Sequence, residues 1–189
     1  MQETRYDVLG IGNAIVDIIG RCDDGFLTKH DLAKGFMRLI DAPEADRLYG
    51  LMGPAMERSG GSAANTIAGV ASFGGKGAFI GRVADDQFGK VFWHDIRASG
   101  VAFETAPATG GLPTAVCLIL VTPDGERTMN TFLGASTELG PKEVDAATIA
   151  ASKVTYLEGY LFDKPEAKEA LHAAAAIAAK AGRKTALSL

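Results

Sequence analysis

The sequence predicts an α/β fold in which a mostly parallel sheet carries helices on both faces and a smaller antiparallel sheet stands beside it. Apolar, strand-like segments alternate with helical patterns along the chain, and this alternation is typical of parallel sheets with helical crossovers. The predicted strands of the main sheet lie near residues 5–12, 77–83, 153–158 and 184–189, and the helical patterns lie near 63–73, 87–98, 141–151 and 165–181.

A second rhythm predicts the smaller sheet, with strand-like runs near 14–20, 35–41, 113–122 and 126–133. Its clearest part is a hairpin, because Thr122-Pro123-Asp124-Gly125 has the composition of a tight turn between two apolar runs. No helical pattern accompanies these strands, so we expect the small sheet to leave one face free. The alternative is a hairpin that packs directly on the main core.

Local signals mark three helix starts. Pro141 and Pro165 suit a first helical turn, and each is closely followed by an acidic residue, which the helix dipole favours. Asp85 or Asp86 is placed to cap the helix near 87–98, because a carboxylate accepts hydrogen bonds from the free N–H groups of the first turn.

Composition indicates a globular protein of 189 residues, with 47% hydrophobic and 22% charged residues. The formal net charge of −4, with Lys and Arg scattered, argues against a nucleic-acid partner. The densest apolar strip, 115–121, is far too short to span a bilayer, so we expect no membrane association and a cytoplasmic location. Cys22 and Cys117 lack a CxxC spacing and the histidines stand far apart, so neither a disulfide framework nor a metal site is expected.

The segment Ser59-Gly60-Gly61-Ser62-Ala63-Ala64-Asn65-Thr66 is the strongest candidate for a binding site. Two adjacent glycines followed by small residues let a ligand approach the backbone, and Asn65 stands at the edge of an apolar run with helical spacing. Such a site offers backbone N–H groups and one side-chain amide to hydroxyls or to an anion. The alternative is an ordinary glycine-containing turn that caps a helix.

Two other segments accompany this glycine pair. Near the N-terminus, a buried strand runs into Asn13 and Asp17, and downstream a second strand leads into a turn and a helix start. The downstream segment has the pattern G-x-V-x-x-D-x-F-G at Gly81, Val83, Asp86, Phe88 and Gly89. In this order, the three segments resemble the ribokinase-like (PfkB) family of carbohydrate and nucleoside kinases.

The resemblance implies a ribokinase-like three-layer fold whose antiparallel sheet is a lid, built near 14–20, 35–41 and 113–133. The resemblance covers residues 5–189, which corresponds to only about half the length of the proteins of this family. We therefore expect 1–189 to be an incomplete kinase domain, with the C-terminal part of the fold missing and the chain belonging to a longer protein.

By the same resemblance, Asn13, Asp17, Gly61 and Asn65 contact the ribose of a nucleoside. The Asn-x-x-x-Asp spacing of the first two resembles the adenosine-kinase branch more than the ribokinases. Carboxylates and amides suit this task because each sugar hydroxyl both donates and accepts hydrogen bonds. The alternatives are a solvated strand end for Asp17 and a turn former for Asn13.

Arg127 and Glu158 are two further candidates for substrate contacts. Arg127 follows the predicted hairpin turn, where the family commonly has an arginine that reaches the substrate from the lid; the alternative is a solvated charge. Glu158 ends the strand near 153–158, at the edge where ligands of open α/β sheets collect. A glutamate faces the sugar at this place in ribokinases, which leaves the choice between nucleoside and sugar open.

The resemblance implies ATP and Mg²⁺ as co-substrate and cofactor. The sequence has no P-loop pattern, and the dinucleotide pattern that opens at Gly10-Ile11-Gly12 lacks its third glycine, since residue 15 is Ile. The family's D-T-x-G-A-G-D-like segment, which supplies the anion hole and the general base, is also absent. We therefore expect no catalytic residue in this chain and a general base downstream of Leu189.

The leading hypothesis is a part of an ATP-dependent kinase that phosphorylates the 5′-hydroxyl of a nucleoside, most like adenosine kinase. One alternative keeps the fold and takes a sugar, as ribokinases and fructokinases do. Another is a catalytically inactive module that binds a sugar or nucleoside. The expected partners are this small molecule and, through the lid, a second copy of the chain in a homodimer.

Overall fold

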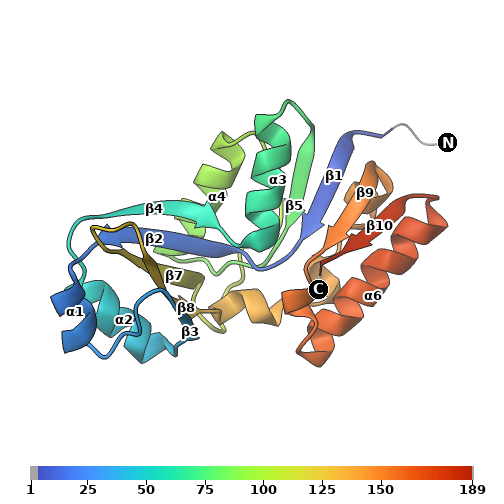
Figure 1. The fold of residues 1–189 in the computed structure, drawn as a ribbon. Helices are drawn as coiled ribbons and strands as arrows, with labels where there is room; N and C mark the ends of the chain where they lie inside the picture. Colours follow the sequence, from blue (N-terminus) through green and yellow to red (C-terminus); the bar gives the residue numbers. More distant parts are fainter. Residues whose placement is uncertain (1–3, 189) are drawn as a thin grey trace.

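Two five-stranded sheets make up the fold, and they lie side by side with helices packed on them (Figure 1). The computed structural model describes residues 4–188. One sheet contains the first strand, and the chain then passes directly into the other sheet and returns to the first. The predicted α/β class, with a separate lid sheet, is confirmed.

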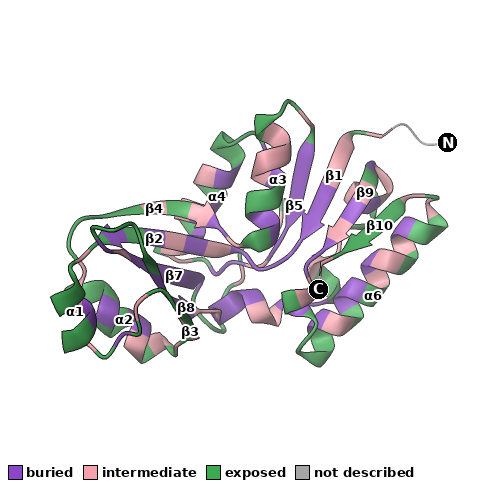
Figure 2. Cartoon of the chain, viewed as in Figure 1, coloured by how far each residue is buried: buried purple, intermediate pink, exposed green. Residues whose placement is uncertain are grey.

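The main sheet is entirely parallel. In spatial order its strands are β10 (Lys184–Leu187), β9 (Ser152–Leu157), β1 (Tyr6–Ile11), β5 (Gly77–Ile80) and β6 (Ala102–Phe103). The four strands predicted for this sheet are therefore neighbours in it, with Val8 of β1 paired to both Gly77 and Val154. The sequence interpretation missed β6, a two-residue strand, and β10 differs from the expected core strand because all four of its residues are exposed (Figure 2).

Helices cover both faces of the main sheet. On one face, α3 (Ser62–Ser72) and α4 (Gln87–Ala98) pack with Phe79, and on the other, α5 (Ala146–Ala150) and α6 (Pro165–Lys180) pack with Leu9 and Ile11. Successive side chains of a strand point to opposite faces, so β1 and β5 contribute to both cores. Figure 2 shows the result as burial along β5 and the second half of β1.

The helix predicted near 141–151 is two short helices instead of one. A 3₁₀ turn spans Pro141–Glu143, and α5 begins afresh behind Asp145. The Asp145 carboxylate accepts hydrogen bonds from the N–H groups of Ala147 and Thr148, so it caps a new helix. The helix near 87–98 is confirmed, and its N-cap is Asp86.

The lid sheet is mixed, so the prediction of an antiparallel lid is only partly right. In spatial order its strands are β3 (Met37–Leu39), β8 (Arg127–Phe132), β7 (Ala115–Val121), β2 (Ile15–Arg21) and β4 (Ala55–Gly60). The pairs β7–β8 and β2–β4 are antiparallel, whereas β2–β7 and β3–β8 are parallel. The reason is that β2 and β7 both enter the lid from the main sheet, so they run in the same direction.

Two helices cover one face of the lid, which contradicts the expectation of a sheet without helices of its own. These helices are α1 (Asp24–Lys29) and α2 (Ala42–Leu51), and their Leu27 and Leu48 pack in the core that holds Val16, Ile18 and Leu118. The opposite face is free, as expected, and exposes large apolar side chains. These are Ile19, Met37, Leu39 and Met56.

Helix α4 shows why the pattern D-x-F-G occurs in this chain. Asp86 caps the helix through the N–H of Gly89 (2.7 Å). A Cβ atom on Gly89 would lie 2.0 Å from the carbonyl oxygen of Ala84, so no larger residue fits there without moving backbone. The glycine therefore allows the first turn of α4 to approach the end of the preceding loop.

This close approach predicts opposite effects of alanine at two helical glycines. Gly89→Ala should lower the free energy of unfolding by more than about 2 kcal/mol, because the clash is with backbone. Gly69→Ala, in α3, meets no atom within 4 Å and should raise it by about 0.5–1 kcal/mol through reduced chain entropy. Urea unfolding of both variants measures the two effects, and equal values would contradict the packing described for Gly89.

Candidate functional site

The candidate site lies where the two sheets meet, at the carboxyl ends of the main-sheet strands. The chain crosses from β1 to β2 through residues 12–14, and it returns from β4 to α3 through Gly60 and Gly61. Strand β9 ends at the same place with Glu158 as the next residue. Ligands of open α/β sheets bind at this edge, so the geometry favours a site here.

Asn13 and Glu158 form a buried pair at the centre of the junction. The Glu158 carboxylate accepts hydrogen bonds from the backbone N–H of Asn13 (2.6 Å) and from its side-chain amide (2.9 Å), both at Oε2. Its other oxygen accepts the backbone N–H of Ala63 in the first turn of α3 (3.0 Å). The Asn13 Oδ1 atom accepts the Ser136 hydroxyl (2.9 Å). The polar atoms of both side chains thus have partners within the protein, and Glu158 is only 1% exposed.

The glycine pair makes room for two neighbouring groups. A Cβ atom on Gly60 would lie 2.3 Å from the Asp17 carboxylate, and one on Gly61 would lie 2.3 Å from the Asn13 carbonyl oxygen. Gly61 also has φ +96°, a conformation that L side chains rarely adopt. The two glycines therefore allow Asp17 and the β1–β2 crossing to approach this segment closely, and Gly61 is also the N-cap of α3.

Asp17 carries the free charge of the site. Its half-buried carboxylate forms no hydrogen bond within residues 4–188. Burial raises its pKa to about 6, while the charge of Arg127 acts in the opposite direction. Across the lid sheet, Asp17 pairs in register with Arg58 of β4 and Cys117 of β7. A carboxylate in this state can accept hydrogen bonds from a hydroxyl-bearing ligand.

Asn65 and Arg127 stand further from this centre. Asn65 lies one turn into α3, where its backbone N–H donates to the Gly61 carbonyl (2.8 Å), and its side chain is exposed. Arg127 is exposed at the start of β8, at the end of the lid away from the junction, although its charge still acts on the Asp17 carboxylate. The structure thus brings together Asn13, Asp17, Gly61 and Glu158, with Asn65 adjacent and Arg127 on the rim of the lid.

Sequence interpretation missed Ser136 and the separate role of Gly60. Ser136 lies in a 3₁₀ turn (Gly134–Glu138) after β8 and contacts Asn13 across 123 positions of sequence. No spacing signal connects residues so far apart. Gly60 was visible as half of the glycine pair, but its contact with Asp17 depends on the β2–β4 register, and β4 has too few apolar residues to be recognised as a strand.

Cys117 lies beside Asp17 on the lid sheet, and its surroundings favour the neutral thiol over the nucleophilic thiolate. Burial raises the pKa of its thiol to about 11, and the Thr131 hydroxyl donates a hydrogen bond to its sulfur (3.2 Å). Within residues 4–188, no group of three or more His, Cys, Asp or Glu side chains is arranged to hold a metal ion. Over the same residues, none of the helices combines the length and hydropathy that a membrane span requires.

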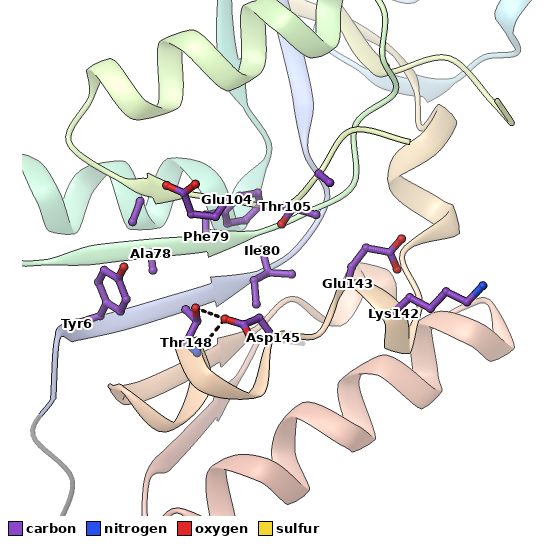
Figure 3. Close-up of a pocket in the computed structure, with 12 residues that line it drawn as sticks. Tyr6, Ala78, Phe79, Ile80, Glu104, Thr105, Lys142, Glu143, Asp145 and Thr148 are labelled. Carbon is purple, nitrogen blue, oxygen red and sulfur yellow. Dashed lines mark hydrogen bonds between the residues drawn. The ribbon is translucent and has the colours of Figure 1, made fainter. Parts of the chain in front are cut away.

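A separate cavity of about 360 Å³ lies over the main sheet near β5, β6 and α5 (Figure 3). None of the candidate residues lines it. Its acidic groups already have partners, since Glu143 binds Arg82 (2.6 Å) and Asp145 accepts hydrogen bonds from Thr148, as Figure 3 shows. The cavity therefore contributes nothing to the site at the junction.

Comparison with protein families identifies the class to which this chain belongs. The model of the pfkB family of carbohydrate kinases matches residues 44–189. This match covers most of the chain, and the chain therefore belongs to the pfkB family.

Solved structures and curated proteins give more detailed similarities. The chain is 60% identical to an adenosine kinase from Sinorhizobium meliloti, with a TM-score of 0.88 over 98% of this chain and 57% of that one. It is 57% identical to a probable sugar kinase from Rhizobium etli CFN 42, with a TM-score of 0.88 over 97% of this chain and 56% of that one. It is 32% identical to fructokinase-2 of Solanum lycopersicum over 52% of this chain and 31% of the fructokinase. The chain thus spans little more than half the length of the two structures and about a third of the curated protein.

The raised pKa of Asp17 predicts how stability depends on pH. Below pH 3.8, its usual pKa, the carboxyl group is neutral in both states, and as pH rises through about 6 the folded protein must hold a desolvated charge. Asp17→Asn removes this cost. The variant should match the parent below about pH 4 and exceed its free energy of unfolding by about 1–2 kcal/mol at pH 8. Urea unfolding across pH 4–8 measures the difference, and a constant difference would contradict the pKa assignment.

Proposed function

We propose that the protein carrying this chain transfers the γ-phosphoryl group of ATP to the 5′-hydroxyl of a nucleoside, with adenosine as the preferred acceptor. The observation that carries this proposal is the 60% identity to a structure described as an adenosine kinase, over 98% of this chain. The Asn-x-x-x-Asp spacing of Asn13 and Asp17 supports the same choice.

Asp17 is the proposed anchor for the sugar. Its carboxylate accepts hydrogen bonds from ribose hydroxyls, and a bidentate carboxylate can hold two neighbouring hydroxyls. Gly61 and Asn65 lie at the start of α3, and they add a backbone group and a side-chain amide as further hydrogen-bonding partners for the sugar. Asn13 is a further proposed contact from the β1–β2 crossing. Because Glu158 and Ser136 already bind its side-chain amide, a ligand contact requires Asn13 to exchange or share these hydrogen bonds.

ATP with Mg²⁺ is the proposed phosphoryl donor, as in kinases of this family. Mg²⁺ would neutralise charge on the phosphates when bound. Residues 4–188 offer no cluster of metal ligands, so we assign no metal contact to them. The general base and the nucleotide site are likewise not assigned to any residue of this chain.

A sugar kinase is the second candidate. The 57% identity to a probable sugar kinase and the fructokinases among the curated relatives support it. Glu158 resembles the sugar-facing residue of ribokinases, but its buried carboxylate would have to exchange its bonds to Asn13 and Ala63 before it could contact a sugar. A module that binds a nucleoside or sugar without catalysis is the remaining alternative.

The free face of the lid supports the expected homodimer. Its apolar side chains, among them Met37 (56% exposed) and Leu39 (63% exposed), would be buried by a second lid. Association through such a face gains free energy from removing apolar surface from water.

An assay of the full-length protein with ATP, Mg²⁺ and a panel of nucleosides and sugars tests the function. We expect adenosine to give the highest kcat/KM. Asp17→Asn should lower kcat/KM about ten- to a hundredfold, because it removes hydrogen bonds to a charged acceptor worth about 1.5–3 kcal/mol. Substrate binding by the parent should tighten as pH rises through about 6, since the hydroxyls prefer the ionised carboxylate.

The matched control is Asp46→Asn, which makes the same chemical change at an exposed position of α2. It should leave kcat/KM within twofold of the parent. A preference for fructose or ribose would select the sugar-kinase alternative, and binding without turnover would select the inactive module. Unchanged kinetics of Asp17→Asn would reject the assignment of the sugar anchor.

A further inference from the structure

Three chain segments that connect the lid with the main body are each held by a carboxylate in the same way. In every case the carboxylate accepts both the backbone N–H and the side-chain donor of a single residue. Glu158 holds Asn13 on the path from β1 to β2 (2.6 and 2.9 Å). Asp86 holds Thr114 at the entrance to β7, with its two oxygens 2.8 Å from the backbone nitrogen and 2.7 Å from the hydroxyl.

Asp95 makes the third of these attachments. It lies on α4, and its Oδ2 atom accepts the backbone N–H (2.7 Å) and the hydroxyl (2.8 Å) of Ser59. The Arg58 guanidinium lies 3.9 Å from its other oxygen. The Asp95 side chain is 25% exposed, and Asp86 is likewise only partly buried, whereas Glu158 is buried.

The position of Ser59 connects this attachment with the candidate site. Ser59 precedes the glycine pair directly, and it pairs with Val16 in the β2–β4 register. The next residue, Gly60, is the one against which the Asp17 carboxylate packs. A shift of Ser59 away from α4 would therefore move Gly60 from Asp17 and let water reach the carboxylate.

We propose that Asp95 is a positioning residue that fixes the Ser59-Gly60-Gly61 segment against α4 and thereby sets the location and solvation of the Asp17 carboxylate. This role rests on the proposed function only for its effect on substrate. The positioning itself does not require a substrate. Asp95 binds Ser59, and the next residue, Gly60, lies against the Asp17 carboxylate.

A purely structural role for Asp95 makes a different prediction. It would lower stability without changing the environment of Asp17. Asp145 provides the comparison, because it also accepts a backbone N–H and the hydroxyl of one residue, Thr148, but it lies at α5, away from the junction. Loss of either carboxylate removes a similar set of hydrogen bonds.

The experiment compares Asp95→Ala, Ser59→Ala and Asp145→Ala in the full-length protein. The first readout is the pKa of Asp17, which is measured without substrate by an NMR titration of its carboxyl carbon. Asp95→Ala should lower this pKa from about 6 toward 3.8, because the carboxylate gains water. Ser59→Ala keeps Asp95 and its neighbour Arg58 and should give a smaller shift in the same direction. Asp145→Ala should give none.

The second readout is steady-state kinetics with the best substrate of the panel. Asp95→Ala should raise KM about five- to twentyfold with kcat changed less than threefold. Ser59→Thr, which keeps both hydrogen-bond donors, should have the KM of the parent protein. An unchanged pKa of Asp17 in a folded Asp95→Ala protein overturns the proposal, whatever the kinetics show. A shifted pKa in Asp95→Ala, together with a parent protein that shows no kinase activity, supports the positioning role and rejects the proposed function.

Discussion

The buried carboxylate of Glu158 is the interaction on which the junction depends. A charge that is withdrawn from water is tolerated only when donors surround it, and here three N–H donors from two separate segments do so. These donors belong to the β1–β2 crossing and to the first turn of α3, while the acid itself ends β9. One side chain thereby joins the centre of the main sheet, the entrance to the lid and the helix that carries the glycine pair.

Small residues at the junction are the complement of this charge. Gly12 shows it directly, because a Cβ atom there would lie 2.5 Å from Ala63 and 2.9 Å from the Glu158 carboxylate. The crossing segment and α3 can share one acid only because neither places a side chain between them. Backbone N–H groups, which every residue but proline has, can then bind the Glu158 carboxylate directly.

The sequence was most informative where apolar runs are long or where glycine and proline mark a turn. The four main strands and the hairpin at 113–133 were predicted for this reason, and so was Asp86 as a cap. Strand β4 was missed because Ala-Met-Glu-Arg-Ser-Gly has no apolar alternation, and α1 because six residues show little periodicity. The attachments of Ser59 and Asn13 join residues 36 and 145 positions apart, which no local pattern can reveal.

The parallel pairing of β2 with β7 has a consequence for how the chain folds. Residues 15–21 lie in the middle of the lid sheet, yet one of their two partner strands follows about a hundred positions later, at 115–121. Contacts of such high sequence separation form slowly, because a long loop must close before they contribute. During synthesis, β2 therefore leaves the ribosome long before its sheet can be completed, with Val16 and Ile18 still unburied. The lid sheet therefore cannot be completed before residues 115–121 have been synthesised, and until then its apolar strands are open to misassociation.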